Sequence, residues 1–119
     1  MDIIKEICEW NKIAWNTKFN KHLEASMLSE EFAELIVALK EWDKKEAVDW
    51  LLDIFWVWIG TLYKMWIEPE DIERALEEIK ESNYSKFEYK DWEYKAIKDE
   101  GWKIMKPKGF KKPNLDFIN

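Results

Sequence analysis

Five carboxylates stand in a helical pattern close to positions that would otherwise carry apolar side chains. They are Glu30, Glu31, Glu34, Asp49 and Asp53. Asp53 is the only ionisable residue in the apolar run 50–61, and burying it unpaired would be costly or would leave it protonated. A divalent cation between several carboxylates lets them stay ionised side by side. The residue types therefore predict a metal site.

The first three carboxylates lie on an amphipathic helix predicted from about residue 23 to 41. Its apolar stripe consists of Leu28, Phe32, Leu35, Ile36 and Leu39. Glu31 is at the edge of this stripe and Glu34 follows it three residues on, so these two carboxylates can share an ion. Glu30 points more nearly away from the stripe.

A short connection near Asp43 leads into a third helix, predicted from about residue 45 to 65, so the second and third helices should be antiparallel neighbours. Three acids of the third helix share one stripe, at spacings of three and four: Glu46, Asp49 and Asp53.

In such a hairpin, Glu31 and Glu34 are level with the region from Asp49 to Asp53, and two carboxylate pairs face one gap. Four oxygen ligands without a histidine or cysteine suit Mg²⁺, or Mn²⁺, better than zinc. The sequence therefore predicts a magnesium site between these two helices.

The remaining pattern predicts an all-α protein, an antiparallel four-helix bundle formed by a single domain over residues 1–119. The first helix should span about 2–19, and the fourth should begin at Pro69 and end near Ser82 and Asn83, which gives a helical core of about 2–82. Tryptophans at helical spacing are expected in the core, although one of them could stack on a base. The C-terminal tail, about 83–119, should be irregular or form a β-hairpin, with a turn at Asp99-Glu100-Gly101.

Composition limits the partners of the chain. A net charge of −6 argues against binding a nucleic-acid polymer but not against a single nucleotide held through metal ions. The longest apolar run is too short to span a membrane, and the single cysteine, Cys8, favours the cytoplasm and a place in the core. The third helix is apolar all round, which predicts a homo-oligomer, either a dimer or a tetramer.

The acidic residues also fit an ordinary solvated helix face, or a non-catalytic helical module whose acidic stripe meets a basic partner. A ferritin-like di-iron site is disfavoured, because it needs two Glu-x-x-His pairs. The only histidine, His22, is expected to be an exposed residue at a helix start.

Several ordered motifs resemble the MazG-like, all-α nucleoside triphosphate pyrophosphohydrolases, in particular their small phage and bacterial members. The motifs are Glu30-Glu31-x-x-Glu34, the helix containing Asp53, Ser82-Asn83-Tyr84-Ser85-Lys86, and the tail patterns Gly101-x-Lys103-x-x-Lys106-Pro107-x-Gly109 and Pro113-x-Leu115. The resemblance covers about residues 23–115. It implies Mg²⁺-dependent hydrolysis of an NTP, in particular a dNTP, to the monophosphate and pyrophosphate in a bacterial or phage-infected cell.

Carried over by position, the resemblance makes Glu31, Glu34 and Asp53 metal ligands. The commoner family pattern has an acid three residues before Asp53, where this chain has Trp50, so Asp49 is expected to take that place.

The resemblance also implies that Asn83 and Lys86 contact the substrate. Glu30 or Glu34 would orient or deprotonate the attacking water, and Lys103 and Lys106 would join Lys86 in balancing phosphate charge. Alternatives on the same scaffold are a phosphoribosyl-ATP pyrophosphohydrolase and a house-cleaning enzyme for modified nucleotides.

Overall fold

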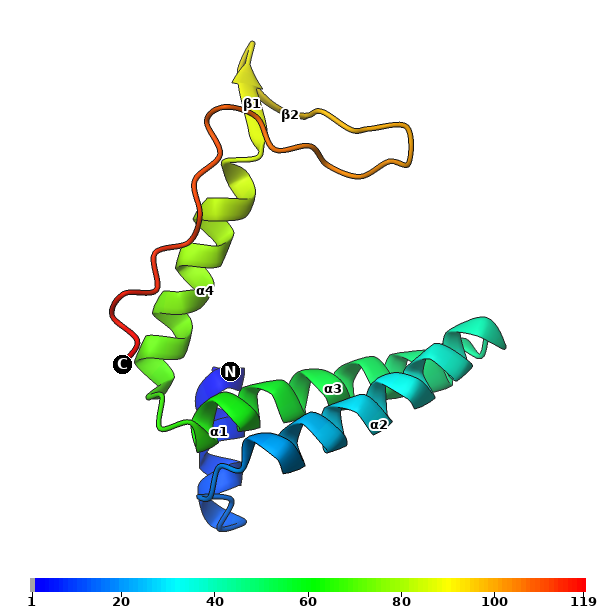
Figure 1. The fold of residues 1–119 in the computed structure, drawn as a ribbon, viewed down its shortest axis with the longest axis vertical. Helices are drawn as coiled ribbons and strands as arrows, with labels where there is room; N and C mark the ends of the chain where they lie inside the picture. Colours follow the sequence, from blue (N-terminus) through cyan, green and yellow to red (C-terminus); the bar gives the residue numbers. More distant parts are fainter. Residues whose placement is uncertain (1) are drawn as a thin grey trace. The chain divides into compact units, whose positions relative to one another are not determined.

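The computed structural model describes residues 2–119, which form four helices followed by a short hairpin (Figure 1). The elements are α1 (Ile3–Ile13), α2 (Lys21–Lys40), α3 (Lys44–Lys64), α4 (Pro69–Tyr84), β1 (Phe87–Lys90) and β2 (Glu93–Ala96). The chain divides into two compact units, one ending at Pro69 and the other beginning at Glu70. The mostly helical content agrees with the all-α prediction, whereas the four-helix bundle and the single domain stay predictions.

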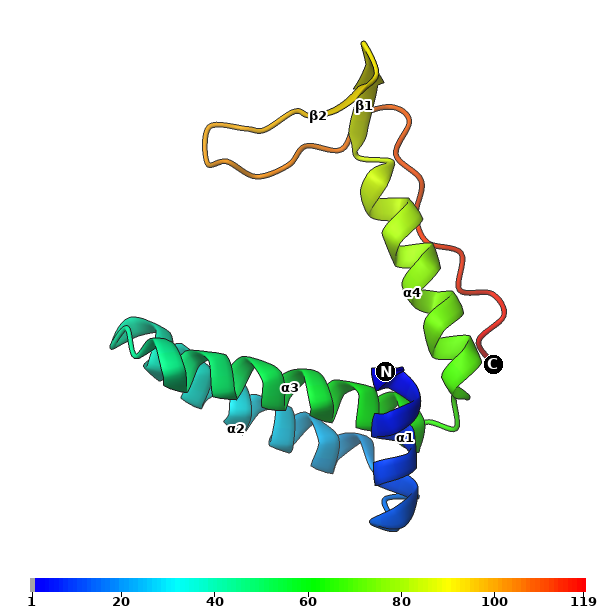
Figure 2. The same cartoon turned by 180° about the vertical axis from the view of Figure 1, so that it is seen from behind.

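The first unit is built on the predicted hairpin of α2 and α3, which lie side by side and antiparallel (Figures 1 and 2). Asp43 starts α3 by accepting a hydrogen bond from the backbone N–H of Glu46 at 3.1 Å. Helix α1 packs on α3. A Cβ at Gly60 would lie only 3.0 Å from the side-chain amide of buried Asn11, so the glycine permits this close approach.

The buried apolar core is small and contains no tryptophan among residues 2–119. In the first unit its members are Ile4, Ile7, Cys8, Leu35, Ala38, Ala47, Ile54 and Ile59, and in the second unit Ile72 is buried. Buried Cys8 agrees with its predicted place in the core. The prediction that tryptophans at helical spacing lie in the core is wrong, because no tryptophan among residues 2–119 is buried. Five of them (Trp15, Trp42, Trp66, Trp92 and Trp102) are 72–88 % exposed.

Three of these tryptophans lie immediately after the C-cap of a helix. Trp15, Trp42 and Trp66 have φ angles of 59°, 52° and 65° and follow α1, α2 and α3. After α2, for example, the N–H of Trp42 donates to the carbonyl of Leu39 and the N–H of Asp43 donates to that of Ala38. This pair of bonds is a Schellman motif, whose left-handed residue is usually glycine.

The left-handed Trp15 also explains where α1 ends. The first helix was predicted to continue to about Phe19, and it ends instead at Ile13, with Ala14 as its C-cap. The N–H of Asn16 donates to the carbonyl of Asn11 at 2.9 Å, which closes the helix end. Apolar periodicity alone did not reveal this stop, because the sequence has no glycine there.

The second unit contains α4, the β-hairpin and the C-terminal tail. Strands β1 and β2 pair antiparallel through a two-residue turn, Asp91-Trp92, in which both residues have positive φ. The predicted turn at Asp99-Glu100-Gly101 lies between Lys98 and Ile104, which form an isolated β-bridge rather than a pair of strands. The expected hairpin exists, but its turn lies earlier in the chain.

The end of the tail runs back beside α4 (Figures 1 and 2). The N–H of Lys111 donates to the Ser85 hydroxyl at 2.9 Å, and the N–H of Asn114 donates to the Glu78 carboxylate at 3.1 Å. These contacts tie the tail to the helix that carries Asn83.

No helix within residues 2–119 has the length and apolar character needed to cross a membrane.

The left-handed tryptophans give the first prediction. Trp42→Gly should raise the free energy of unfolding by about 1 kcal/mol, because it removes a disfavoured backbone conformation and gives up a side chain that is 72 % exposed. Urea unfolding measures the change. Trp10→Gly, inside α1 and stacked edge-on against Trp56, is the control and should destabilise. A lower stability of the Trp42 variant would contradict the prediction.

Candidate active site

The predicted carboxylates belong to α2 and α3, the two helices that pack on each other along a seam. Buried Leu35 and Ala38 of α2 and buried Ala47 and Ile54 of α3 form the apolar part of this seam. The small alanines near the closed end let the two helices approach closely. Packing of these four residues therefore decides which polar side chains of the two helices face one another.

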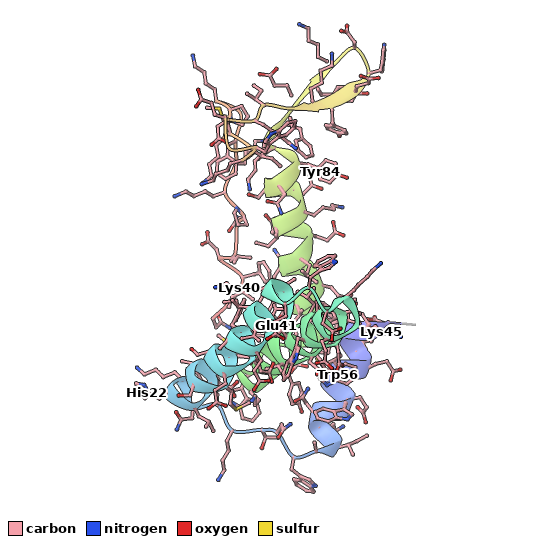
Figure 3. All side chains as sticks on the ribbon, turned by 90° about the vertical axis from the view of Figure 1, so that its right-hand side faces the viewer. His22, Lys40, Glu41, Lys45, Trp56 and Tyr84 are labelled. Carbon is pink, nitrogen blue, oxygen red and sulfur yellow. The ribbon has the colours of Figure 1, made fainter. Side chains whose placement is uncertain are left out.

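The two ends of α2 are easily distinguished in Figure 3. Lys40 and Glu41 lie at the closed end of the hairpin near Lys45, whereas His22 lies at the opposite end of α2. His22 is exposed, as predicted, and its backbone N–H donates to the N-cap Asn20. The histidine thus belongs to a helix start.

Glu31 is the one carboxylate of the predicted set that is partly buried. Its Oε2 atom is shielded from solvent and has no hydrogen-bond partner. Its pKa is raised above the ordinary 4.5, first by burial, then by the negative charge of Asp53 and then by that of Glu34. The structure therefore brings Glu31, Glu34 and Asp53 close enough to repel one another.

The remaining two carboxylates of the set, Glu30 and Asp49, are exposed on the same helices, as are Glu34 and Asp53. As the side chains lie, no three carboxylate, imidazole or thiol groups within residues 2–119 converge tightly enough to hold a metal. The ligand set consequently stays a prediction.

The chemistry of these residues nevertheless fits a divalent cation. The donors are all oxygens, which Mg²⁺ and Mn²⁺ prefer. The shielded Glu31 oxygen has no partner in the protein, and a cation would satisfy it and reverse the repulsion from Glu34 and Asp53.

A groove of about 350 Å³ adjoins the carboxylates toward the closed end of the hairpin. Val37 and Trp50 give it apolar walls, and Glu34, Glu41 and Glu46 give it negative charge. The volume is in the range of small-molecule sites, about 300–1,000 Å³. An anionic ligand would enter this groove only with accompanying cations.

A further buried carboxylate, Glu24, was not among the predicted site residues. It is 4 % exposed, forms an ion pair with Lys64, and accepts a hydrogen bond from the Thr61 hydroxyl at 2.9 Å. The available sequence signal was its position seven residues before Glu31, which places both on one face of α2. Its partners on α3 could not be foreseen from spacing.

The predicted substrate-binding residues Asn83 and Lys86 belong to the second unit. Asn83 is exposed in the last turn of α4, and its carbonyl accepts a hydrogen bond from the N–H of half-buried Lys86 at 3.2 Å. Ser85 between them donates to the carbonyl of Ser82 at 2.6 Å and accepts from the N–H of Lys111. Ser85, whose part the sequence did not indicate, fixes the backbone of this segment.

The other two predicted lysines lie in the tail. The backbone N–H of Lys103 donates to Asp99 at 2.9 Å, which leaves its exposed side chain outside the turn. The ammonium group of Lys106 lies 4.9 Å from the centre of the Phe110 ring. Both lysines thus belong to the same unit as Asn83 and Lys86, and their contact with a substrate stays a prediction.

Comparison with known proteins gives one match. The family model described as phosphoribosyl-ATP pyrophosphohydrolase matches residues 2–83, which include all five predicted carboxylates and Asn83. Lys86, Lys103 and Lys106 lie beyond the matched segment. No curated protein and no solved structure matches the chain.

The state of Glu31 gives the second prediction. Because its pKa is raised in the folded protein, metal-free protein should lose stability as the pH rises from about 4.5 through the raised pKa. Glu31→Gln removes this loss and should be the more stable protein at neutral pH. Urea unfolding in EDTA across this pH range measures both effects.

The exposed neighbour Glu30 provides the control for that experiment. Glu30→Gln should keep the pH dependence of the parent protein. Added Mg²⁺ should stabilise the parent and the Glu30 variant more than the Glu31 variant. Equal pH dependence in the parent and the Glu31→Gln protein would contradict the assignment.

Proposed function

Because the chain belongs to the phosphoribosyl-ATP pyrophosphohydrolase family, within the MazG-like superfamily of nucleotide pyrophosphohydrolases, we propose that it hydrolyses a nucleoside triphosphate to the monophosphate and pyrophosphate with Mg²⁺. Membership supports a hydrolase acting on a phosphoric anhydride. A deoxynucleoside triphosphate is the proposed substrate, as the resemblance of the motifs implied.

The observation that carries this proposal is the half-buried Glu31 inside the matched family segment. A shielded carboxylate oxygen without a partner, facing the charges of Asp53 and Glu34, is unfavourable in the protein alone. It becomes favourable with a bound divalent cation, and a cation is what a triphosphate needs in order to approach an acidic groove.

In the proposed mechanism, Glu31, Glu34, Asp49 and Asp53 hold the metal. Bound Mg²⁺ would supply charge neutralisation on the phosphates and would lower the pKa of a bound water. Glu31 and Glu34 come from α2 and Asp49 and Asp53 from α3, so the packing of these two helices would set the spacing of the ligands.

The attacking water needs a base, and Glu30 and Glu34 are the proposed candidates. Both are exposed carboxylates beside Glu31, and a carboxylate within hydrogen-bonding reach of the water can orient it or accept its proton. Glu34 also lines the groove, which supports it as the residue nearer to the substrate.

Phosphate charge that the metal leaves uncovered would be met by Lys86, Lys103 and Lys106, with Asn83 hydrogen-bonding to the nucleotide. All four are in the second unit, where the Ser85 contacts order the segment between Asn83 and Lys86.

A homo-oligomer, a dimer or tetramer, is part of the proposal. Six apolar side chains of α2 and α3 are 43–63 % exposed: Ile36, Val37, Leu39, Val48, Leu51 and Leu52. So much apolar surface on two adjacent helices supports association with a second copy. Light scattering that finds only monomer at micromolar concentration would contradict this part.

The family match also favours a second candidate substrate, phosphoribosyl-ATP itself, because the matching model carries that description. Both candidates contain the same triphosphate and release pyrophosphate, so the carboxylate site serves either. The deciding experiment incubates the protein with Mg²⁺ and each common NTP, each dNTP, modified nucleotides and phosphoribosyl-ATP, and measures pyrophosphate. Release from none of them would favour the non-catalytic helical module.

The third prediction concerns the facing carboxylate. Asp53→Asn should lower kcat/KM for pyrophosphate release by at least about 100-fold, because even outer-shell changes at metal sites typically cost 10- to 100-fold. Circular dichroism should show the helices intact, since Asp53 is exposed. Glu9→Gln on the exposed face of α1 is the control and should be fully active. An undiminished rate of the Asp53 variant would remove it from the site.

A further inference from the structure

We propose that Glu24 and Lys64 are positioning residues, whose buried ion pair fixes the register in which α2 presents Glu31 to Asp53. The inference rests on the proposed function for its catalytic consequence. Its structural consequence, the register of the two helices, stands apart from any activity.

The ion pair is buried on both sides. The side chain of Glu24 is 5 % exposed and that of Lys64 is 13 % exposed. Both carboxylate oxygens of Glu24 are used, one by Lys64 and the other by the Thr61 hydroxyl at 2.9 Å. Removing any one partner would leave a buried charge unsatisfied, so the three groups must meet in this one arrangement.

The pair lies on the same seam as the metal site. Glu31 is seven residues after Glu24, about 10 Å along α2, and Asp53 is eight residues before Thr61, about 12 Å along α3. Because the helices are antiparallel, these two steps run in the same direction along the seam. The ion pair and the carboxylate cluster therefore depend on the same alignment of α2 along α3.

The rest of the seam selects the register weakly. Its buried residues are apolar, and two of them, Ala38 and Ala47, are small. Apolar contacts tolerate a shift by a turn, whereas a buried polar contact accepts only one partner arrangement.

The experiment replaces the pair by an apolar one, Glu24→Leu with Lys64→Leu, which preserves folding in many buried pairs. The register is measured by nuclear Overhauser contacts between the rings of Phe32 on α2 and Trp58 on α3, whose centroids lie 5.8 Å apart. We expect these contacts to be lost. The Mg²⁺ concentration for half-maximal activity should rise at least about tenfold, with KM at saturating Mg²⁺ changed little, as metal-supporting changes cost 10- to 100-fold.

Two controls keep this test decisive. The charge-swapped protein, Glu24→Lys with Lys64→Glu, should recover the ring contacts and most of the Mg²⁺ response, and it decides the matter if the apolar variant does not fold. The surface pair of α4 changed by Glu77→Gln and Lys80→Met should alter neither readout. Unchanged ring contacts and Mg²⁺ response in the apolar variant would overturn the proposal. If the apolar variant loses the ring contacts but the parent protein releases no pyrophosphate, the register proposal holds and only the proposed function is refuted.

A separate observation carries a second inference. We infer that Trp15, Trp42, Trp66, Trp92 and Trp102 occupy glycine positions of this fold, because their codon is UGA and the organism that carries the gene reads UGA as glycine. UGA is translated as tryptophan in some genetic codes and as glycine in others. Translation of such a gene in the first kind of code places tryptophan at each of these positions.

Backbone geometry separates these five residues from the other tryptophans. Among residues 2–119, the non-glycine positions with positive φ are these five and Asp91. Trp15, Trp42 and Trp66 follow helix C-caps, where glycine is the usual residue. Trp92 completes an Asp-x turn whose favoured form is Asp-Gly.

The fifth residue, Trp102, follows the same rule. Its N–H donates to the carbonyl of Asp99 at 3.0 Å, and the N–H of Asp99 donates to the carbonyl of Lys103 at 2.9 Å. This is a type I turn followed by a left-handed residue, again a glycine position. Each of the five side chains is at least 72 % exposed, so packing does not explain a tryptophan there.

Composition agrees with the inference. The chain has 3 glycines and 9 tryptophans in 119 residues, whereas average glycine usage of about 7 % predicts about eight. Moving five residues from one count to the other gives eight glycines and four tryptophans. The exchange restores the expected number of glycines.

Peptide mass spectrometry of the protein isolated from the organism that carries the gene tests this inference. We expect glycine at positions 42, 66 and 92, and tryptophan at Trp10 and Trp56, whose rings contact each other inside the helical unit at a centroid distance of 5.7 Å. The gene should have UGA at the three positions and UGG at the two controls. Tryptophan in the isolated peptides, or UGG codons at positions 42, 66 and 92, would overturn the inference.

Discussion

Repulsion between carboxylates on facing helices is the constraint on which the first unit depends. Glu31 is pressed between α2 and α3 with an oxygen that no protein group satisfies, and Asp53 and Glu34 add negative charge around it. This arrangement of charges is unfavourable in the protein alone. Burial of Leu35 and Ile54 and the ion pair of Glu24 with Lys64 keep α2 and α3 packed. The carboxylates are therefore kept near one another by interactions outside their own cluster.

The helices were largely predictable because each carries a regular apolar stripe. The ends of α2, α3 and α4 were predicted to within a few residues, since Asp43 and Pro69 are recognisable start signals. The end of α1 was missed for a different reason: its left-handed residue is Trp15 rather than glycine. The hairpin turn at Asp91-Trp92 was missed in the same way, because Asp-Gly would have signalled it and Asp-Trp does not.

Only those features of the candidate site that follow from helical periodicity could be predicted from the sequence. Spacing along one helix placed Glu31 beside Glu34, and the short connection at Asp43 brought Asp53 opposite them. The pairing of Glu24 with Lys64 was not visible, because an acid in the first turn and a base in the last turn of a helix are both commonplace. Partners 40 residues apart are chosen by packing, which spacing within a single helix does not describe.

Family membership indicates the type of bond that is hydrolysed, a phosphoric anhydride, more clearly than it indicates which nucleotide is the substrate. The matched segment, residues 2–83, contains every carboxylate proposed to hold metal, whereas Lys86, Lys103 and Lys106 lie beyond it. A triphosphate carries several negative charges, and the charged residues that line the groove of the first unit are the acids Glu34, Glu41, Asp43 and Glu46. Under the proposed function, bound metal would supply the positive charge at these carboxylates. The matched segment therefore supports hydrolysis of a phosphoric anhydride, and the substrate is the part of the proposal that the pyrophosphate-release assay decides.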